Sequence, residues 1–506
     1  MSRVGVDIDV GQHARADQRE VVRAGPSSVY HLWQQCNTTQ KTRSRVFVLT
    51  SCTKKDTAVV STPLLKVGVT VSNTAPLSGA IKGTLLANQT YSISGDVIIN
   101  ATDTLLIQQG VKINISNGAN FIVHGTFISL GSKSAPITIT DPTKTKTTGN
   151  SSAATDPAYV GGWGGIYCDV TCPLLVIKWT HLDFGGAGLI APPFTGPSTG
   201  DQYIIYWQNP NGNLILEDSW LYGSPDDAVR FYGGNINVMR NTLEKLGGTG
   251  GDGFNAKGGT QGNMAYNLII GGATNGTKSA NDGAKGSIQT QIAMYNNTYV
   301  NGGFRNAGTF GARSGSIEVE NNSRALAYNN LIVDCNFGVR IAGGNLVTAK
   351  VYLADTLSHT DGPILKTAYG HNFFYADNVA QANQIVPTNI AQAVVTHPQA
   401  TDIPNMFAFL GPTYTFGFAY DGTSLVGQNN PKFVNYPLPN LNFANQASVD
   451  AFDFHLQAGS PAAGKGLTTF SPIINVPINK NFGSSEITPP GKDIGCFQLD
   501  GTGNQH

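Results

Sequence analysis

Short apolar segments recur along the chain, and each is interrupted by one polar residue. Five segments share this outline: Asn213–Leu221, Asn237–Leu243, Asn263–Ile270, Ile292–Val300 and Ala325–Val333. If Ser219, Asn241, Asn267, Asn297 and Asn330 are equivalent, the steps are 241−219 = 22, 267−241 = 26, 297−267 = 30 and 330−297 = 33 residues. A repeat of this length is typical of a solenoid, in which each unit packs only on its neighbours.

Within each segment the apolar residues alternate on both sides of the polar position. This pattern predicts two short strands joined by a tight bend, with the apolar side chains pointing inward. Asparagine suits the bend because it tolerates a left-handed backbone and bonds to nearby peptide groups. Coils stacked in parallel about 4.8 Å apart would align these residues, so we expect them to hydrogen-bond along the stack. Sixty glycines and 25 prolines also favour turns and strands over helices.

Motifs at both ends of the repeat resemble a known family. They are Gly110–Thr140 and Gly161–Cys168 at the start, and Asn430–Pro437, Asp453–Gly466 and Lys492–Gln498 at the end. These segments resemble the entry and closing coils of secreted proteins with a right-handed parallel β-helix, the fold of pectate lyases and many bacterial surface proteins. The resemblance implies one all-β solenoid over residues 83–500. The range 345–428 lacks the pattern and is expected to form an irregular insertion or cap.

Residues 1–51 form an atypical leader, followed by an expected linker at 52–82. Leu49-Thr50-Ser51-Cys52 resembles the lipobox of bacterial lipoproteins, and the Lys54-Lys55-Asp56 that follows is similar to many lipoproteins of Bacteroidota. The resemblance implies a lipid on Cys52 and an outer-membrane or cell-surface location. However, a signal peptide needs about 7–15 apolar residues, and only Val46–Leu49 precedes this motif. An ordinary cysteine in a leader is the alternative.

Composition limits the class of partner. Lys plus Arg and Asp plus Glu both number 32, and only 13% of residues are charged, which argues against a nucleic-acid partner bound by charge. No run of eighteen apolar residues occurs, so membrane contact is expected only through a lipid anchor. The resemblance to secreted β-helix proteins implies an extracellular or cell-surface monomer whose partner is a polysaccharide.

The glycine-rich segment Gly247–Gly259 permits several interpretations. A dinucleotide site would need a helix after the glycines, and a calcium nonapeptide works only in tandem; neither context is present. Asp252-Gly253-Phe254-Asn255-Ala256-Lys257 does resemble part of the calcium site of some pectate lyases. The second part departs from that pattern, because Asn281-Asp282-Gly283-Ala284-Lys285 replaces two of its carboxylates and calcium needs mostly anionic oxygens.

Candidate catalytic residues lie along one expected edge of the coils. Asp226, Asp227, Asp252 and Asp282 recur near the coil step and are the candidate ligands of a calcium ion. Lys257, Arg305, Arg313 and Arg340 are the candidate base and anion-stabilising groups of a lyase that removes a proton beside a uronate carboxyl. Two stacked carboxylates would also suit a glycoside hydrolase. The structural alternative is that each Asp only marks a turn.

The same fold serves enzymes, adhesins and stalks, so it does not determine an activity. Because the calcium motif is broken, the sequence favours an exported β-helix protein that binds an extracellular polysaccharide along its lateral groove without catalysis. A polysaccharide lyase is the alternative, and a glycoside hydrolase is a further one.

Overall fold

The computed structural model describes residues 64–147, 149, 152–248, 250–281, 289–305, 315–320, 323–336, 338–342, 368–378, 430–438, 452–473 and 487–506. Contacts divide the chain into Met1–Thr62 and Pro63–His506, and all described residues belong to the second unit. Strands make up nearly all of its regular structure; among the described residues the only helix is the 3-10 turn Pro157–Tyr159. The predicted all-β class is confirmed.

Successive strands occupy three positions in turn, which we call faces A, B and C. After the first coil, a strand on each face pairs in parallel with the strand three places later in the chain, as β13 with β16 and β16 with β19. Face A consists of β2 (Gly83–Leu85), β4 (Thr104–Gln108), β7 (Thr126–Leu130), β10 (Leu174–Lys178), β13 (Asn213–Glu217), β16 (Asn235–Met239), β19 (Gln261–Ala265), β22 (Gln291–Tyr295), β25 (Arg324–Tyr328) and β28 (Ala368–Gly370).

Faces B and C share the long strand β3 (Thr90–Ile99), with which β1 (Leu77–Ala80) pairs. Face B continues with β5 (Lys112–Ile115), β8 (Ile137–Thr140), β11 (Thr180–Asp183), β14 (Trp220–Ser224), β17 (Thr242–Leu246), β20 (Leu268–Ile270), β23 (Thr298–Val300), β26 (Leu331–Val333) and β29 (Phe373–Tyr375). Face C continues with β6 (Phe121–Val123), β9 (Ile166–Cys168), β12 (Ile205–Trp207), β15 (Val229–Tyr232), β18 (Phe254–Lys257), β21 (Thr277–Ser279), β24 (Ile317–Glu320) and β27 (Val339–Ala342).

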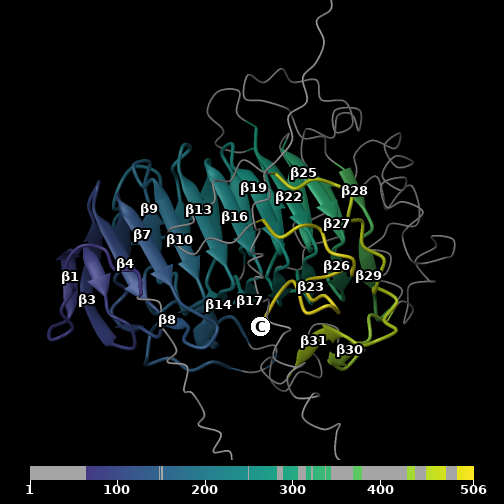
Figure 1. The fold of residues 1–506 in the computed structure, drawn as a ribbon, viewed down its shortest axis with the longest axis horizontal. Coiled ribbons are helices and arrows are strands. Elements are labelled where there is room, and N and C mark those ends of the chain that lie inside the picture. The colour runs from purple at the N-terminus through teal and green to yellow at the C-terminus, as the bar shows by residue number, and fades with distance from the viewer. Residues whose placement is uncertain are drawn as a thin grey trace, which may run out of the picture. The chain divides into compact units, whose positions relative to one another are not determined.

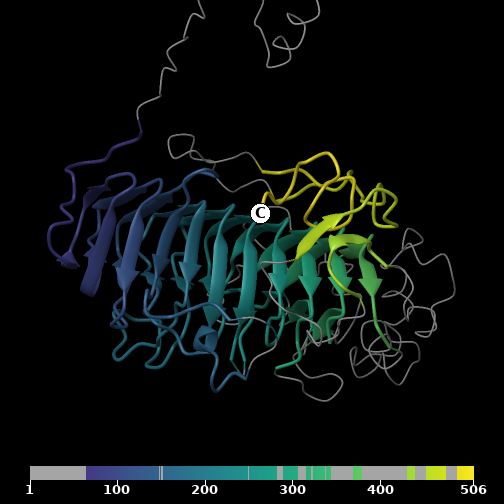
Figure 2. The same ribbon diagram turned by 90° about the horizontal axis from the view of Figure 1, so that it is seen from below.

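Each coil therefore adds one strand to each of three parallel sheets, and the coils follow one another along the stack (Figures 1 and 2). This arrangement is the predicted parallel β-helix. Its right-handed sense stays a prediction. The register is continuous between neighbouring coils; Leu214, for example, pairs with Ile236 and Ile236 with Gly262.

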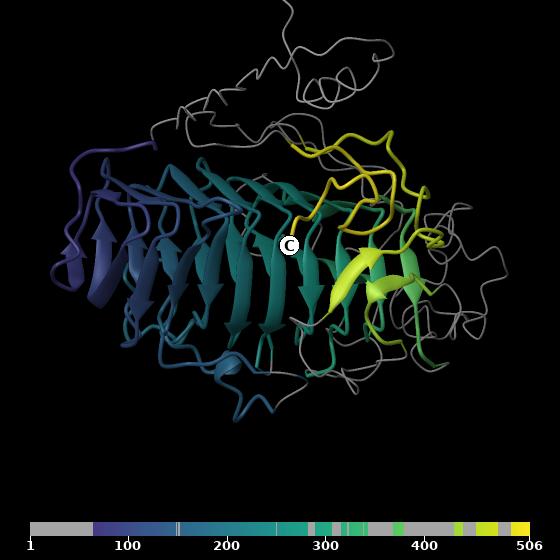
Figure 3. The same cartoon turned by 60° about the horizontal axis from the view of Figure 1, so that its bottom comes forward.

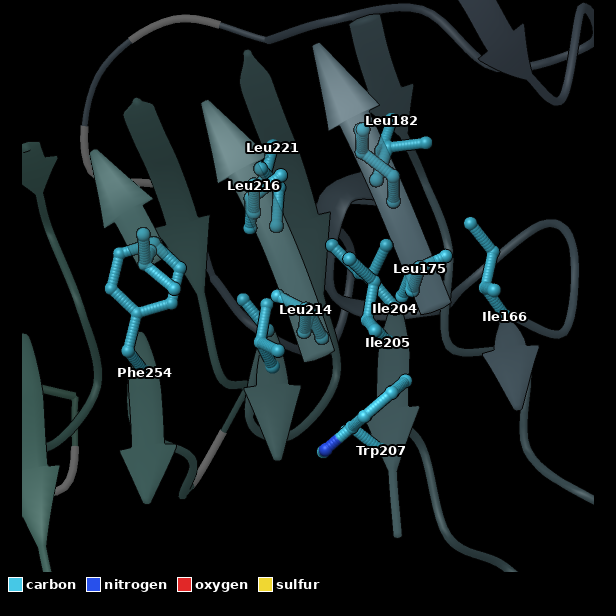
Figure 4. Packing of buried hydrophobic residues seen from close by; sticks show 14 of the residues in the cluster. Ile166, Leu175, Leu182, Ile204, Ile205, Trp207, Leu214, Leu216, Leu221 and Phe254 are labelled. Atoms are coloured by element: carbon cyan, nitrogen blue, oxygen red, sulfur yellow. The ribbon is translucent and has the colours of Figure 1, made fainter. Parts of the chain in front are cut away.

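The core fills the space enclosed by the three faces. Because side chains alternate along a strand, every second residue points inward, as Ile205 and Trp207 do from β12 and Leu214 and Leu216 from β13 (Figure 4). These side chains are fully buried. Burial of one such side chain stabilises the fold by about 1.5–3 kcal/mol, so the repeated inward positions carry most of the stability.

The predicted polar ladder is present at the corner between faces A and B. Asn267 donates its side-chain N–H to Oδ1 of Asn297 at 3.0 Å, and Asn297 donates to Oδ1 of Asn330 at the same distance. The steps of 22, 26, 30 and 33 residues are confirmed. The ladder also extends beyond the predicted members, to Thr180 on one side and to Asn372 on the other.

One detail of the predicted corner is wrong. The left-handed residue is not the ladder asparagine but the residue before it, and this position is occupied by Trp179, Asp218, Arg240, Tyr266, Asn296, Asn329 and His371, with φ between 48° and 59°. A left-handed backbone costs a non-glycine residue roughly 1–2 kcal/mol. The buried ladder bonds that follow each of these residues offset that cost.

Regular pairing extends beyond both predicted boundaries. It begins within the expected linker 52–82, because β1 pairs with β3 and Thr70 bridges Thr84. It also continues into the range 345–428, where β28 and β29 pair in register with β25 and β26. The rest of that range, apart from residues 368–378, lies outside the described residues.

The C-terminal segment packs on face B of the later coils (Figure 3). It contains the antiparallel pair β30 (Phe433–Asn435) and β31 (Asp453–Leu456). Phe433, Phe454 and Phe497 pack with the outward-facing Leu331, Val333 and Phe373 in one buried cluster. Face B is thus covered over the later coils, and a cleft lies where this cover ends.

Candidate functional site

A cleft of about 370 Å³ lies between face B and the C-terminal segment. The strands β11, β14, β17 and β20 provide its floor, and β31 provides part of its wall. Its lining residues are Lys146, His181, Trp220, Thr242, Glu244, Leu268, Ile270, Phe452, Asp453, Phe454, His455, Phe497 and His506.

Two rows of outward-facing residues form the floor. His181 is in register with Trp220, Trp220 with Thr242, and Thr242 with Leu268. Two residues further along each strand, Asp183, Tyr222, Glu244 and Ile270 form the second row, of which Glu244 and Ile270 line the cleft. Parallel neighbours on one face lie about 4.8 Å apart, so the stacking of coils places aromatic, hydroxyl, carboxylate and aliphatic groups side by side.

Trp220 is the centre of an aromatic stack at one end of the cleft. The His181 ring stacks on the indole at 4.1 Å with an interplanar angle of 3°, and the His506 ring stacks on it at 3.8 Å and 19°. Nδ1 of His506 also lies 2.9 Å from the Thr242 hydroxyl. Burial lowers the pKa of His181 to about 4 and that of His506 to about 3. Both imidazoles are therefore neutral near pH 7.

Charged groups lie on both sides of this stack. The Lys146 ammonium lies 3.4 Å from the Asp183 carboxylate and 4.7 Å from the centre of the Tyr222 ring. On the opposite wall, Asp453 and His455 form a pair at 2.7 Å, and the His455 ring packs on Phe497 at 4.0 Å. Glu244 lines the floor between these groups and is half-buried.

The cleft combines apolar surface with hydrogen-bonding groups of both kinds. The edge of Trp220, whose two faces are covered by His181 and His506, and the side chains of Phe452 and Phe497 offer apolar surface. Thr242, Glu244 and His455 offer donors and acceptors. A polyhydroxylated ligand with apolar C–H faces needs both kinds of contact. A saccharide is such a ligand.

The site expected from the sequence lies at a different corner, between faces B and C. Asp227 and Asp252 do lie on neighbouring coils, as predicted, because the Asp252 backbone N–H donates to Oδ1 of Asp227 at 2.6 Å. The Asn255 amide donates to both carboxylates at 2.9 Å. One coil further on, Asn275 takes the equivalent position and donates to Oδ1 of Asp252 from its backbone N–H and its amide.

These two carboxylates are fully engaged within the protein. Asp227 also accepts from Arg230 at 2.6 and 2.7 Å, and Asp252 accepts from the Thr274 hydroxyl at 2.6 Å. Both aspartates are buried. Asp227, Asp252 and Asn275 thus form a second polar ladder, which supports the structural interpretation of this corner.

Charged residues next to this ladder on face C are also paired with one another. In the register of face C, Arg230, Asn255, Lys278, Glu318 and Arg340 follow one another on successive coils. Lys278 lies 2.5 Å from Glu320 and 3.7 Å from Glu318. Although burial lowers the pKa of Lys278, the carboxylates Asp252, Glu318 and Glu320 raise it above its ordinary value. Lys278 is therefore a poor base.

Among the described acids of this corner, Asp226 combines a raised pKa with partial exposure. Burial and the adjacent Asp227 raise the pKa of Asp226 to about 6. The side chain is half-buried. It can exchange a proton near neutral pH, but the neighbouring carboxylate Asp227 is committed to Arg230 and Asn255.

The candidate cations have different positions. Lys257 lies on face C in register with Tyr232. Arg305 donates to the backbone carbonyls of Leu246, Gly247 and Gly271 and stacks on Tyr159 at 4.4 Å. Its guanidinium thus holds loops of two coils together. The backbone of Arg340 pairs with Glu318. Asp282, Lys285, Arg313 and Cys52 lie outside the described residues.

The described residues of this corner do not fit a calcium ion. Calcium requires six to eight oxygen ligands, whereas N–H and ammonium groups occupy the oxygens of Asp227, Asp252 and Glu320. Within the described part of the chain, no group of three or more His, Cys, Asp or Glu residues is arranged to hold a metal ion. The predicted calcium site stays a prediction.

Comparison with protein-family models, with curated proteins and with solved structures found no match to this chain. The class is therefore defined by the fold alone, as an all-β parallel β-helix. Among the described residues, no helix has the length and hydrophobicity to span a bilayer.

Sequence reasoning missed the cleft on face B. Its residues come from five separate parts of the chain, around 146, 181, 220–244, 268–270 and 452–506. One signal was present: Trp220 occupies an outward position of a strand, directly after the ladder residue Ser219, where an exposed aromatic residue is unusual.

Proposed function

We propose that this protein binds a saccharide in the cleft on face B, as an exported carbohydrate-binding β-helix protein. The observation that supports this most is the cleft itself, in which the stacked Trp220 lies beside Thr242, Glu244 and His455. Export and lipid attachment at Cys52 belong to the same proposal and have their own test, which is acylation of Cys52 in the producing cell.

Non-catalytic binding is favoured over a lyase or hydrolase at the corner between faces B and C. A lyase needs a base that can release and accept a proton beside the substrate. Of the cations predicted for this chemistry, Arg305 is bound to the backbone carbonyls of Leu246, Gly247 and Gly271, while Lys257 stays the candidate base. A hydrolase needs two accessible carboxylates, and Asp227 and Asp252 are buried and share one amide donor.

The test is calorimetric titration of the protein with a panel of oligosaccharides, comparing native protein with Trp220→Ala. We expect the substitution to weaken binding at least tenfold, because it removes the ring that both imidazoles pack on. The matched control is Tyr232→Ala, which removes a half-buried aromatic residue from face C, and which should bind as the native protein does.

Unfolding temperatures of both variants separate a binding defect from misfolding. The proposal is overturned if Trp220→Ala binds like the native protein, or if only Tyr232→Ala loses binding. The same samples are followed by ultraviolet absorbance for unsaturated products and by reducing-end assay. Either signal would show that the protein is an enzyme and would overturn the proposal of non-catalytic binding.

A further inference from the structure

Two cysteines flank the turn that leads from face C to face A. Cys168 is the last residue of β9, and Cys172 lies two residues before the start of β10. The backbone N–H of Cys172 donates to the carbonyl of Asp169 at 3.2 Å. A turn closed in this way holds its first and last Cα atoms within about 7 Å of each other. The chain therefore returns Cys172 to the neighbourhood of Cys168.

Side-chain hydrogen bonds fix the shape of this turn. Oδ1 of Asp169 accepts from the backbone N–H and the hydroxyl of Thr171 at 2.9 and 2.7 Å. Oδ2 of the same carboxylate lies 2.6 Å from Nδ1 of His124, and the carbonyl of Cys172 accepts from the Asn209 amide at 2.8 Å. The turn is thus tied to the coils on both sides, and these contacts hold the two cysteines in place.

Both cysteine side chains point into the core. Cys168 and Cys172 are fully buried in the same apolar cluster, and a side-chain hydrogen bond links them. In the structure both are free thiols. The sulfur atoms of a disulfide lie about 2 Å apart, so two thiols that already hydrogen-bond to each other need only a small shift to form one.

We propose that Cys168 and Cys172 form a disulfide that cross-links the two ends of this turn. The two thiols lose two protons and two electrons to a small disulfide oxidant, which is reduced to two thiols, and the reaction passes through a mixed disulfide. Oxidising compartments outside the cytoplasm favour it. In the producing cell the inference therefore rests on the proposed export, but it does not depend on saccharide binding.

Burial determines when the bond can form. Burial and the contact with Cys172 raise the pKa of the Cys168 thiol, and the thiolate is the form that attacks a disulfide. In the folded protein the pair is therefore unreactive. The bond forms during folding, while the turn is still exposed, and the closed core then shields it from reductants.

The experiment refolds the full chain in a mixture of reduced and oxidised glutathione, denatures it with N-ethylmaleimide present and digests it with trypsin. Cleavage after Lys146 and Lys178 leaves both cysteines in one peptide. We expect this peptide to carry no label, to be two hydrogens lighter than the dithiol form, and to take up two labels after reduction. The peptides that contain Cys335 and Cys496 are internal controls and should be labelled without reduction.

A matched variant tests the same bond through stability. Refolding with a reductant in place of glutathione should lower the unfolding temperature of the native protein by several degrees, but not that of the double variant Cys168→Ala, Cys172→Ala. Labelling of both cysteines without reduction, or a bond from either one to Cys335 or Cys496, would overturn the inference. If the bond forms in glutathione while protein from the producing cell holds both thiols reduced, the proposed export fails and the chemistry of the turn stands.

Discussion

The charged row of face C and the cleft on face B are built alike but end differently. Both present ionisable side chains at outward positions of neighbouring coils. On face C the charged side chains form ion pairs with one another, Arg230 with Asp227 and Lys278 with Glu320. On face B the C-terminal segment contacts the floor through His506, at Trp220 and Thr242, and leaves a cavity beside this contact. The comparison shows that an outward-facing position does not by itself make a binding site. Whether a cleft forms depends on which side chains or segments pack against that position.

The largest expected effect is on the stability of the ladder at face C. Asp252→Ala should lower the free energy of unfolding by about 3–5 kcal/mol, because it leaves the buried donors of Asn255, Thr274 and Asn275 without their acceptor. Chemical denaturation measures this loss. Asp252→Asn, which keeps an acceptor oxygen, should cost clearly less. A variant that keeps native stability but loses saccharide binding would instead make this corner the site.

The second-largest effect is a loss of folding stability at acidic pH, which arises from the histidines of the cleft. The pKa of His181 is about 4 in the folded protein, below its ordinary value near 6.5. The unfolded chain therefore binds more protons between pH 6.5 and 4, and stability is lost as the pH falls through this range. We expect a loss on the order of 2 kcal/mol between pH 7 and 4.

Comparison with a variant isolates this contribution. His181→Phe retains an aromatic ring against Trp220 but has no group that can be protonated. The stability of this variant should therefore fall less on acidification than that of the native protein. The comparison is needed because the raised pKa of Asp226, about 6, acts in the opposite direction. Equal pH dependence in the two proteins would refute the neutral state of His181.

The smallest effect is expected at Lys257, the base suggested by its sequence context. It lies on face C, away from the lining of the cleft, and is half-buried. Lys257→Ala should change the unfolding free energy by no more than about 1 kcal/mol and leave saccharide affinity unaltered. Loss of an unsaturated product in this variant would restore the lyase interpretation.

The fold could be predicted because a solenoid repeats its structural rules in its sequence. Asn241, Asn267, Asn297 and Asn330 recur at the coil step since each must satisfy the same buried backbone groups. Asp227 and Asp252 were placed together for the same reason. The next position of this ladder is taken by Asn275, which the sequence did not indicate because insertions between strands change the spacing from coil to coil.

The cleft could not be predicted because no repeat encodes it. His181, Trp220 and Glu244 follow the coil register, but Phe452 and His506 reach them only through the folding of the C-terminal segment on face B. The exit motifs Asp453–Gly466 and Lys492–Gln498 were identified in the sequence, whereas the coil on which they pack was not. Similarly, the repeat indicates which charged residues share one edge of the coils. It does not indicate which of them form ion pairs, because this depends on their side-chain rotamers.

The most direct test of the account is a crystal structure of the protein with a bound oligosaccharide. The account predicts electron density for the sugar in the cleft, against Trp220 and within hydrogen-bonding distance of Glu244 or His455. Density along face C instead, beside Arg230 and Lys257 with the cleft lacking ligand, would contradict it.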